Sequence, residues 1–403
     1  MTTILLIIIY LAFISLGLPD SLLGAAWPVM QPDLGAPLET AGFLFMTVAG
    51  GTIISSLISG KALKRFGTGK VTFVSVLMTA CALLGFHFAP SVGWLVVCAI
   101  PLGLGAGAVD AGLNDYVATH YKAHHMSWLH CFWGVGATLG PIIMAQFFVA
   151  GNSWRNGYFA ISGIQFALVI ILLFTLPLWN KVNKNSNIVL NENQENESVN
   201  EGAKDVTPLR IKGVKLALAA FLFYCAVEAT VGLWGSSFLV NVKGVNAAMA
   251  AKWVSLYYAG ITIGRLITGF VTFKMTNRTL IRTGQIIALT GAIILFLPLP
   301  TIFSLVGFII VGLGLAPIFP CMLHETPTRF GKKHSQTIMG YQMAVAYTGT
   351  TFMPPLLGFI ASYSTIGIFP ISIVLFVAAM VLSSEKLNSL LKQKVLLGNT
   401  SLK

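Results

Sequence analysis

The sequence predicts an all-α membrane protein whose twelve transmembrane helices form two six-helix bundles. Three observations favour this fold class. Hydrophobic residues make up 56% of the chain and charged residues only 9%, whereas about a quarter of a soluble domain is charged. Apolar runs of about 20 residues, long enough to cross a bilayer, recur along the chain. Finally, stretches of the second half repeat stretches of the first half.

The apolar runs define the expected helices in order. We expect spans at 4–28, 39–60, 70–89, 93–118, 127–150, 157–179, 213–240, 246–273, 282–300, 302–324, 336–361 and 363–383. The first run lacks a basic leader and is too long for a signal peptide, so we interpret it as a membrane helix. The polar segment between the sixth and seventh runs is rich in Asn and Glu and predicts a flexible cytoplasmic linker.

These runs predict the domain organisation. The expected parts are an N-terminal bundle, a linker, a C-terminal bundle and a cytoplasmic tail, at 1–180, 181–212, 213–383 and 384–403.

The distribution of positive charge predicts the orientation. Of the 25 lysines and arginines, 21 fall in segments on the same side as the N-terminus. Only Arg155, Lys243 and Lys252 fall on the other side, and Arg265 lies inside a span. Because cytoplasmic loops carry the excess of positive charge, both termini are expected in the cytoplasm of a cell-membrane protein. The asymmetry also accounts for the net charge of +12 without a nucleic-acid partner, and we expect none.

An internal repeat relates the two halves. The stretches GTIISSLISG (51–60) and GITIGRLITG (260–269) are identical at five of ten positions. The same offset places Gly103 of the fourth span on Gly312 of the tenth. Two related bundles are typical of proteins that work by alternating access rather than through a continuous pore.

One loop resembles a family signature. The loop GKALKRFGTGK (60–70) is similar to the segment between helices two and three of the major facilitator superfamily. Arg65 matches the arginine of that signature, and Lys64 stands where the family usually has aspartate. The resemblance implies the major facilitator fold and a gating role for Arg65.

Three further stretches resemble a narrower branch. GAVDAGLNDY (107–116), WLHCFWGVGATLGP (128–141) and FLFYCAVEATVGLWGSSFLV (221–240) are similar to the fucose permease and sodium-dependent glucose transporter branch. The resemblance implies sugar uptake coupled to protons or sodium, through a cavity lined by helices one, four, seven and ten.

Ionisable residues inside the spans are the candidates for function, because a charge at the bilayer centre costs about 2.5–3.5 kcal/mol. Glu228 lies near the middle of span seven, and Asp20 occupies the matching place in span one. We interpret both as proton-coupling groups. The alternatives are a structural acid at Glu228, and an Asp20 that bonds to backbone freed by Pro19.

Polar and aromatic side chains suggest where a solute binds. Asp110 and Asn114 lie four apart on one face of span four. A carboxylate accepts hydrogen bonds from hydroxyl groups, and an amide both donates and accepts them, so the pair suits a polyhydroxyl ligand. The alternative is a hydrogen bond between helices. Other side chains able to stack on or bond to a sugar include Tyr224, Trp234 and Gln342.

Three charged residues are expected to act in gating. Asp115 lies on another face of span four, nearer the cytoplasm, where a lysine or arginine of a loop could pair with it. Arg265 either reaches the cytoplasmic interface or pairs with an acid, and an ion pair is the favoured interpretation. Arg65 completes the set.

The combined hypothesis is a secondary active transporter that moves a sugar or similar small polar solute, by proton-coupled symport. The alternatives are a proton-driven exporter of drugs or metabolites, and a membrane sensor that binds a solute without moving it. No nucleotide loop, metal-ligand spacing or nucleophile constellation indicates an enzyme. We expect no cofactor and no metal, a proton rather than sodium as the coupling ion, and a monomer in the lipid bilayer.

Overall fold

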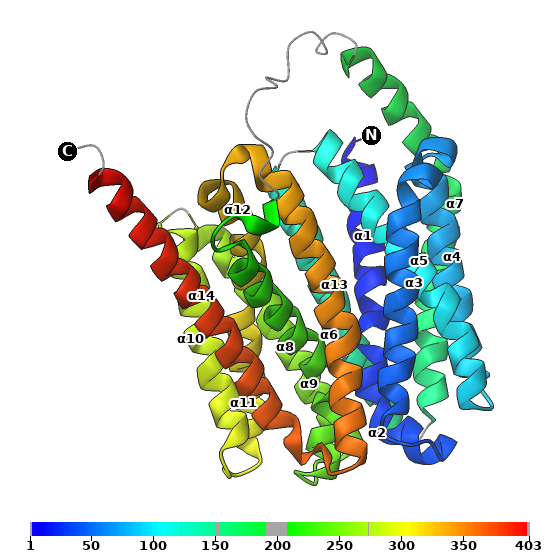
Figure 1. Cartoon of the computed structure of the whole chain (residues 1–403). Coiled ribbons are helices and arrows are strands. Elements are labelled where there is room, and N and C mark those ends of the chain that lie inside the picture. Colours follow the sequence, from blue (N-terminus) through cyan, green and yellow to red (C-terminus); the bar gives the residue numbers. More distant parts are fainter. Residues whose placement is uncertain (1, 122, 150–152, 191–207, 273, 401–403) are drawn as a thin grey trace. The chain divides into compact units, whose positions relative to one another are not determined.

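Helices make up the fold (Figure 1). A computed structural model describes residues 2–121, 123–149, 153–190, 208–272 and 274–400. Within these ranges, twelve helical segments are long and apolar enough to cross a membrane, as the sequence predicts. The helices of the first half are α1 (Thr2–Asp20), α2 (Leu22–Leu34), α3 (Thr40–Phe66), α4 (Thr68–His87), α5 (Val92–His120), α6 (Ala123–Val149) and α7 (Trp154–Leu190).

The second half begins with the short helix η1 (Pro208–Arg210). Its longer helices are α8 (Val214–Asn241), α9 (Ala247–Val271), α10 (Asn277–Phe296), α11 (Ile302–Leu315), α12 (Ile318–Phe330), α13 (Lys332–Ser362) and α14 (Phe369–Thr400). The short helix η2 (Ile366–Ile368) precedes α14. The tenth span consists of α11 and α12, which are separated next to Pro317.

The first span also consists of two helices, and the break between them follows Pro19. Proline has no N–H, so the carbonyl of Ser15 loses its helical donor. The side-chain amide of Gln165 on α7 donates to that carbonyl over 2.8 Å. The freed carbonyl is therefore bonded by Gln165 of a neighbouring helix and not by Asp20, as the alternative interpretation of Asp20 required. α1 ends at Asp20, and α2 begins at Leu22.

The described chain divides into two compact units. Unit 1 comprises residues 1–22 and 47–205, and unit 2 comprises residues 23–46 and 206–403. The helical pairs of unit 1 include α4 with α5 and α7, and α1 with α6. In unit 2, α8 packs against α13 and α14, and α11 packs against α9 and α10. The sequence predicted that residues 23–46 belong to the N-terminal bundle, whereas the structure groups them with the second half of the chain.

Close helix contacts place residues 23–46 in unit 2. A Cβ added to Gly24 of α2 would collide with the carbonyl oxygen of Gly232 on α8. A Cβ added to Gly42 of α3 would lie 2.7 Å from the Cα of Pro355 on α13. Glycine lets helix backbones approach this closely, which strengthens van der Waals packing between membrane helices.

The repeat seen in the sequence has a structural counterpart within each unit. In unit 1, a Cβ on Gly103 of α5 would lie 3.1 Å from the Cα of Gly51 on α3. In unit 2, a Cβ on Gly260 of α9 would lie 3.4 Å from the carbonyl carbon of Gly312 on α11. The offset that aligns Gly51 with Gly260 also aligns Gly103 with Gly312, so equivalent glycines meet in both units.

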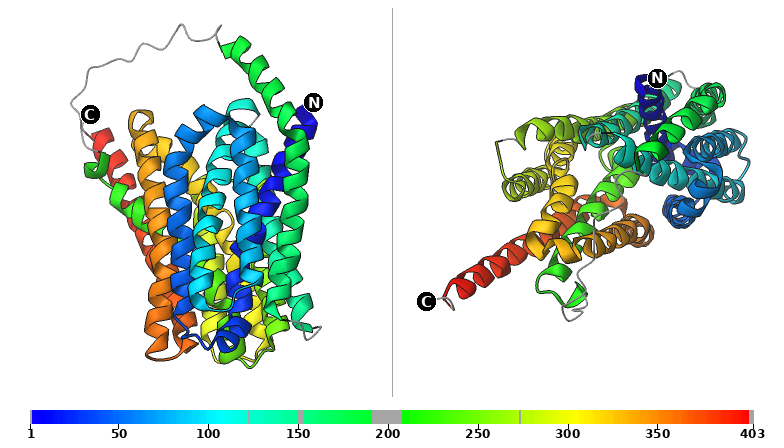
Figure 2. Two further views of the ribbon diagram at one scale, coloured as in Figure 1. Left: turned by 90° about the vertical axis from the view of Figure 1, so that its right-hand side faces the viewer. Right: turned by 90° about the horizontal axis from the view of Figure 1, so that it is seen from above.

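Two helices extend beyond the expected spans. α7 continues to Leu190, into the segment expected to be a linker, and residues 191–207 lie outside the described residues. α14 continues to Thr400, through the segment expected to be a tail. The right-hand view of Figure 2 shows the C-terminal part of α14 extending away from the other helices of unit 2.

Candidate functional site

An ion pair inside the membrane-spanning part of unit 2 joins two residues that the sequence assigned to separate roles. Glu228 projects from α8 and Arg265 from α9, and Arg265 Nη2 lies 3.4 Å from Glu228 Oε1. The two side chains are 20% and 14% exposed. The ion-pair interpretation of Arg265 therefore holds within this unit, and its partner is the candidate proton-coupling acid.

Tyrosines surround this pair. The hydroxyl of Tyr257 on α9 donates to the backbone carbonyl of Glu228 over 3.2 Å. Tyr224, one turn before Glu228 on α8, is fully buried. Both rings are close enough to interact electrostatically with the carboxyl group of Glu228. The site therefore combines a partly accessible charge pair with a buried aromatic wall.

A second cluster lies in unit 1, next to the break in the first span. Nε1 of Trp133 on α6 donates to Oδ2 of Asp20 over 2.7 Å. On α5, Nδ2 of Asn114 donates both to the carboxylate and to the carbonyl of Asp110, each over 2.9 Å. The carboxyl groups of Asp20 and Asp110 are close enough to interact electrostatically.

The sequence left open the alternative that Asp110 and Asn114 make a hydrogen bond between helices, and the structure differs from it. The hydrogen bonds of Asn114 stay within α5 rather than joining two helices. Asp110 and Asn114 are both half-buried, so part of each side chain remains accessible. Unit 1 therefore holds two hydrogen-bonded pairs, Asp20 with the indole of Trp133 and Asp110 with Asn114, whose acceptors and donors suit a hydroxylated solute.

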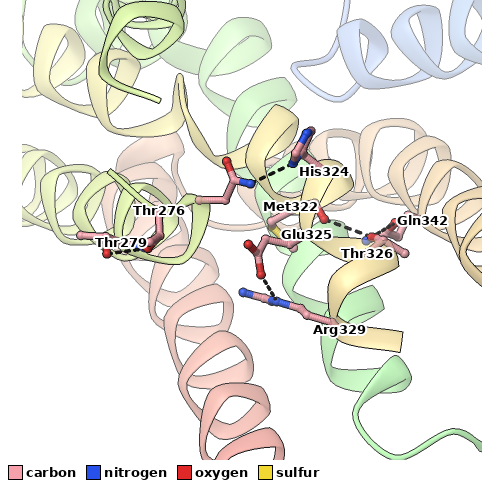
Figure 3. Close-up of polar contacts among 9 residues, drawn as sticks. Thr276, Thr279, Met322, His324, Glu325, Thr326, Arg329 and Gln342 are labelled. Carbon is pink, nitrogen blue, oxygen red and sulfur yellow. Dashed lines mark hydrogen bonds and ion pairs between the residues drawn. The ribbon is translucent and has the colours of Figure 1, made fainter. Parts of the chain in front are cut away.

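Two side chains that were expected to contact a solute are instead buried between helices. Trp234 is fully buried, and its Nε1 donates to the carbonyl of Pro354 on α13 over 2.7 Å. Gln342 is 1% exposed, and its Oε1 accepts from the hydroxyl of Thr326 on α12 over 2.9 Å (Figure 3). Both residues join helices of unit 2, because a buried polar group needs a partner. We therefore remove them from the candidate solute-binding set, and Tyr224 remains only as part of the wall beside Glu228.

Arg65 and Asp115 were each expected to act in gating, and the described residues show no ion pair for either of them. Both side chains are exposed. The guanidinium of Arg65 lies 5.3 Å from the centre of the ring of Phe66. Their gating role stays a prediction.

A further charge pair, between Glu325 and Arg329 of α12, was not predicted from the sequence. Arg329 Nε lies 3.1 Å from Glu325 Oε2, and the side chains are only 9% and 17% exposed. Figure 3 shows this pair together with His324 of the same helix. Nδ1 of His324 lies 2.9 Å from Nδ2 of Asn277 on α10. The signal was available, since an acid and an arginine four residues apart meet on one face of a helix.

Metal-binding geometry is absent from the part of the chain that the structure describes. No group of three or more His, Cys, Asp or Glu side chains there could hold a metal ion.

Comparison with known proteins connects this architecture to relatives. The Glucose/mannose transporter GlcP of Bacillus subtilis (strain 168) is 23% identical, over 92% of this chain and 92% of the relative. Bypass of stop codon protein 6 of Saccharomyces cerevisiae (strain ATCC 204508 / S288c) is 24% identical, over 88% of this chain and 76% of the relative. The inward-open structure of the xylose transporter XylE from E. coli shares the fold, with a TM-score of 0.74 and 14% identity over 96% of each chain.

A family model gives the classification. The model described as Major Facilitator Superfamily matches residues 9–347, which is most of the chain. This match agrees with the twelve apolar spans and with the fold shared with XylE. The chain belongs to the Major Facilitator Superfamily and is a multi-pass membrane transporter, not an enzyme.

Proposed function

We propose that this protein is a secondary active transporter that moves a sugar or a similar small polar solute by proton-coupled symport. The observation that carries the proposal is the Glu228–Arg265 pair, an acid and a base kept inside the membrane-spanning part and still partly accessible. The similarity to the glucose/mannose transporter GlcP supports a sugar as solute.

Solute contacts are assigned to unit 1. Asp110 and Asn114 offer a carboxylate and an amide on one face of α5, and Trp133 adds an aromatic surface beside Asp20. A hydroxyl group of a solute can donate to either carboxylate and accept from the Asn114 amide. Binding of such a solute would replace the hydrogen bonds that Asn114 makes to Asp110.

Proton coupling is assigned to Glu228, with Asp20 as the matching acid of unit 1. When Glu228 is ionised, its attraction to Arg265 stabilises the contact between α8 and α9. A proton on Glu228 removes that attraction and leaves Arg265 without its counter-ion. An exchange between these two states links the protonation of Glu228 to the arrangement of α8 and α9.

The proposed location is the cell membrane, with both termini in the cytoplasm and a monomeric transporter. The excess of lysine and arginine on the side of the N-terminus supports this orientation. A proton is the proposed coupling ion, because protonation alone is enough to break the Glu228–Arg265 attraction.

The central test replaces Glu228 by Gln. In proteoliposomes with an acidic outer solution, the wild-type protein is expected to accumulate D-glucose, D-mannose or D-xylose against a gradient. Glu228→Gln should lose accumulation but keep counterflow, because a neutral amide mimics the protonated acid and cannot release a proton. Radiolabelled uptake measures both reactions.

The matched control is Glu385→Gln. Glu385 also pairs with an arginine, Arg282, over 3.2 Å, but their side chains are 37% and 65% exposed. This variant should keep accumulation. Full accumulation by Glu228→Gln would reject the coupling role, uptake driven only by sodium would reject the proton, and net efflux of solute would favour the exporter.

A further inference from the structure

Unit 2 contains a polar pocket away from the residues discussed so far. The pocket has a volume of about 520 Å³, within the range of about 300–1,000 Å³ that is typical of small-molecule sites. Its walls come from the end of α2, the loop before α3, the ends of α8 and α13, and the segment that leads into η2. The polar residues of its lining are Gln31, Glu39, Asn241, Ser362, Tyr363 and Thr365.

The acid in this lining has an unsatisfied oxygen. Oε2 of Glu39 is buried and has no hydrogen-bond partner among the residues that the structure describes. A buried carboxylate oxygen without a donor is costly, because it has lost its hydration and gained nothing in return. A turn of the Glu39 side chain toward the pocket, where a ligand supplies a hydroxyl or amine donor, would remove this cost.

The hydroxyl groups in the lining are oriented for complementary roles. Ser362 Oγ donates to the carbonyl of Phe359 over 2.7 Å, so its lone pairs remain as acceptors. Thr365 Oγ1 accepts from the backbone N–H of Gly367 over 3.1 Å, so its own proton remains to be donated. The pocket that Glu39 lines therefore also presents at least one acceptor and one donor.

The amides and the aromatic ring complete the lining. Gln31 and Asn241 each add a carboxamide, which both donates and accepts. Tyr363 is 80% exposed, and its ring packs edge-on against Phe359 with the centroids 5.1 Å apart. An exposed aromatic face of this kind suits the C–H faces of a sugar ring.

This mixture of groups selects one ligand chemistry. A metal ion would meet several N–H and O–H donors, and the described lining holds only one acid. An anion would be repelled by Glu39. A neutral ligand with several hydroxyl groups can donate to Glu39 and Ser362 and accept from Thr365 and the amides. We propose that this pocket is a second binding site for a hydroxylated solute, separate from the site around Asp110 and Asn114.

The position of the pocket gives the second site a role. Asn241 ends α8, and that helix begins beside η1 at the opposite end of unit 2. With the termini in the cytoplasm, the pocket opens toward the outside. The site then captures solute before transport, and this role rests on the proposed function.

The experiment measures binding stoichiometry in lipid nanodiscs. Full-length protein is titrated with tritiated D-glucose and with tritiated D-mannose, and bound sugar is counted by scintillation proximity. We expect two equivalents of sugar per wild-type chain. Glu39→Ala and Asn241→Ala should each bind one equivalent, and Asn114→Ala should lose the other.

The control is Thr301→Ala, which lies in the loop before α11 at the same end of unit 2 and outside the lining. It should keep both equivalents. Thermal unfolding of every variant identifies those that fail to fold, and counterflow by Glu39→Ala shows that the inner site still works.

The outcomes separate the two proposals. A single equivalent in the wild type, lost in Asn114→Ala and kept in Glu39→Ala, would overturn the second site and leave the proposed function standing. Two equivalents in both the wild type and Glu39→Ala would overturn the placement in this pocket. Loss of one equivalent in Glu39→Ala without transport under any gradient would support the pocket and refute the proposed function. No binding and no transport of either sugar would refute both.

Discussion

Glu228 and Arg265 show what a single side chain contributes to this transporter. Each would be costly alone in the membrane-spanning part, and each is tolerable because the other lies 3.4 Å away. The sequence identified both residues as in-membrane charges. It did not pair them, because the contact depends on how α8 and α9 are rotated about their axes. The same limit applies to Trp234, because the apolar sequence of α8 does not show which face of that helix packs against α13.

The first residue-scale prediction is a double-mutant cycle on this pair. Arg265→Gln leaves the carboxylate of Glu228 without its counter-ion and should destabilise the protein by about 1–3 kcal/mol. The double variant Arg265→Gln with Glu228→Gln should be more stable than Arg265→Gln alone, because no uncompensated charge remains.

Thermal unfolding in detergent, at a pH where the carboxylate is ionised, measures this cycle. The exposed pair Arg282–Glu385 is the reference, since such surface pairs contribute about 0–1 kcal/mol. Strictly additive effects of the two substitutions would contradict the direct interaction.

At the scale of helices, glycines decide how closely neighbours approach. Gly24 on α2 meets the backbone of Gly232 on α8, with no room for a methyl group. The two positions match across the repeat, at the same spacing that matches Asp20 with Glu228. The spacing of the repeat alone does not predict that the two matching glycines touch.

The second prediction tests this crossing. Gly24→Ala should destabilise the arrangement of α2 on α8 by about 1–3 kcal/mol, because an added methyl group must displace a backbone. The midpoint temperature of thermal unfolding and the rate of sugar counterflow should both decrease. Gly163→Ala is the matched control, since a Cβ at Gly163 of α7 would meet no atom within 4 Å. Equal stability of the two variants would contradict the close contact.

Helix boundaries were predicted well where apolar runs end at polar residues or at Gly and Pro. The expected span 213–240 corresponds to α8, and 246–273 corresponds to α9. Hydropathy failed where a helix continues in polar sequence, as in α7 after Trp179 and in α14 after Leu382. A hydropathy criterion finds the buried part of a helix and cannot register its continuation into water.

For the whole molecule, the proposed orientation rests on the distribution of charge and not on packing. Of the 25 lysines and arginines, 21 fall on the side of the N-terminus. The twelve spans and the family follow from sequence alone, because hydrophobic length and repeated motifs are properties of the chain. The unit to which residues 23–46 belong could not be predicted, because it depends on contacts between residues far apart in the sequence.

The third prediction concerns this orientation. In intact cells, a membrane-impermeant maleimide should label a cysteine placed at Thr301 and should not label one placed at Arg278. The background for both variants is a chain whose own five cysteines are replaced by alanine. Labelling of the Arg278 position from outside would reverse the proposed topology.

The assignment of residues 23–46 to unit 2 has a mechanical consequence. α3 is a continuous helix whose first residues, 40–46, belong to unit 2 and whose remainder belongs to unit 1. If the units move against each other during transport, either α3 must bend or Gly42 must separate from Pro355. Gly50 and Gly51 follow directly after the boundary, and paired small residues are where helices bend most readily. In the proposed transport cycle the second span would then act as a flexible connection, and Gly50→Ala, whose added Cβ meets no atom within 4 Å, should slow transport.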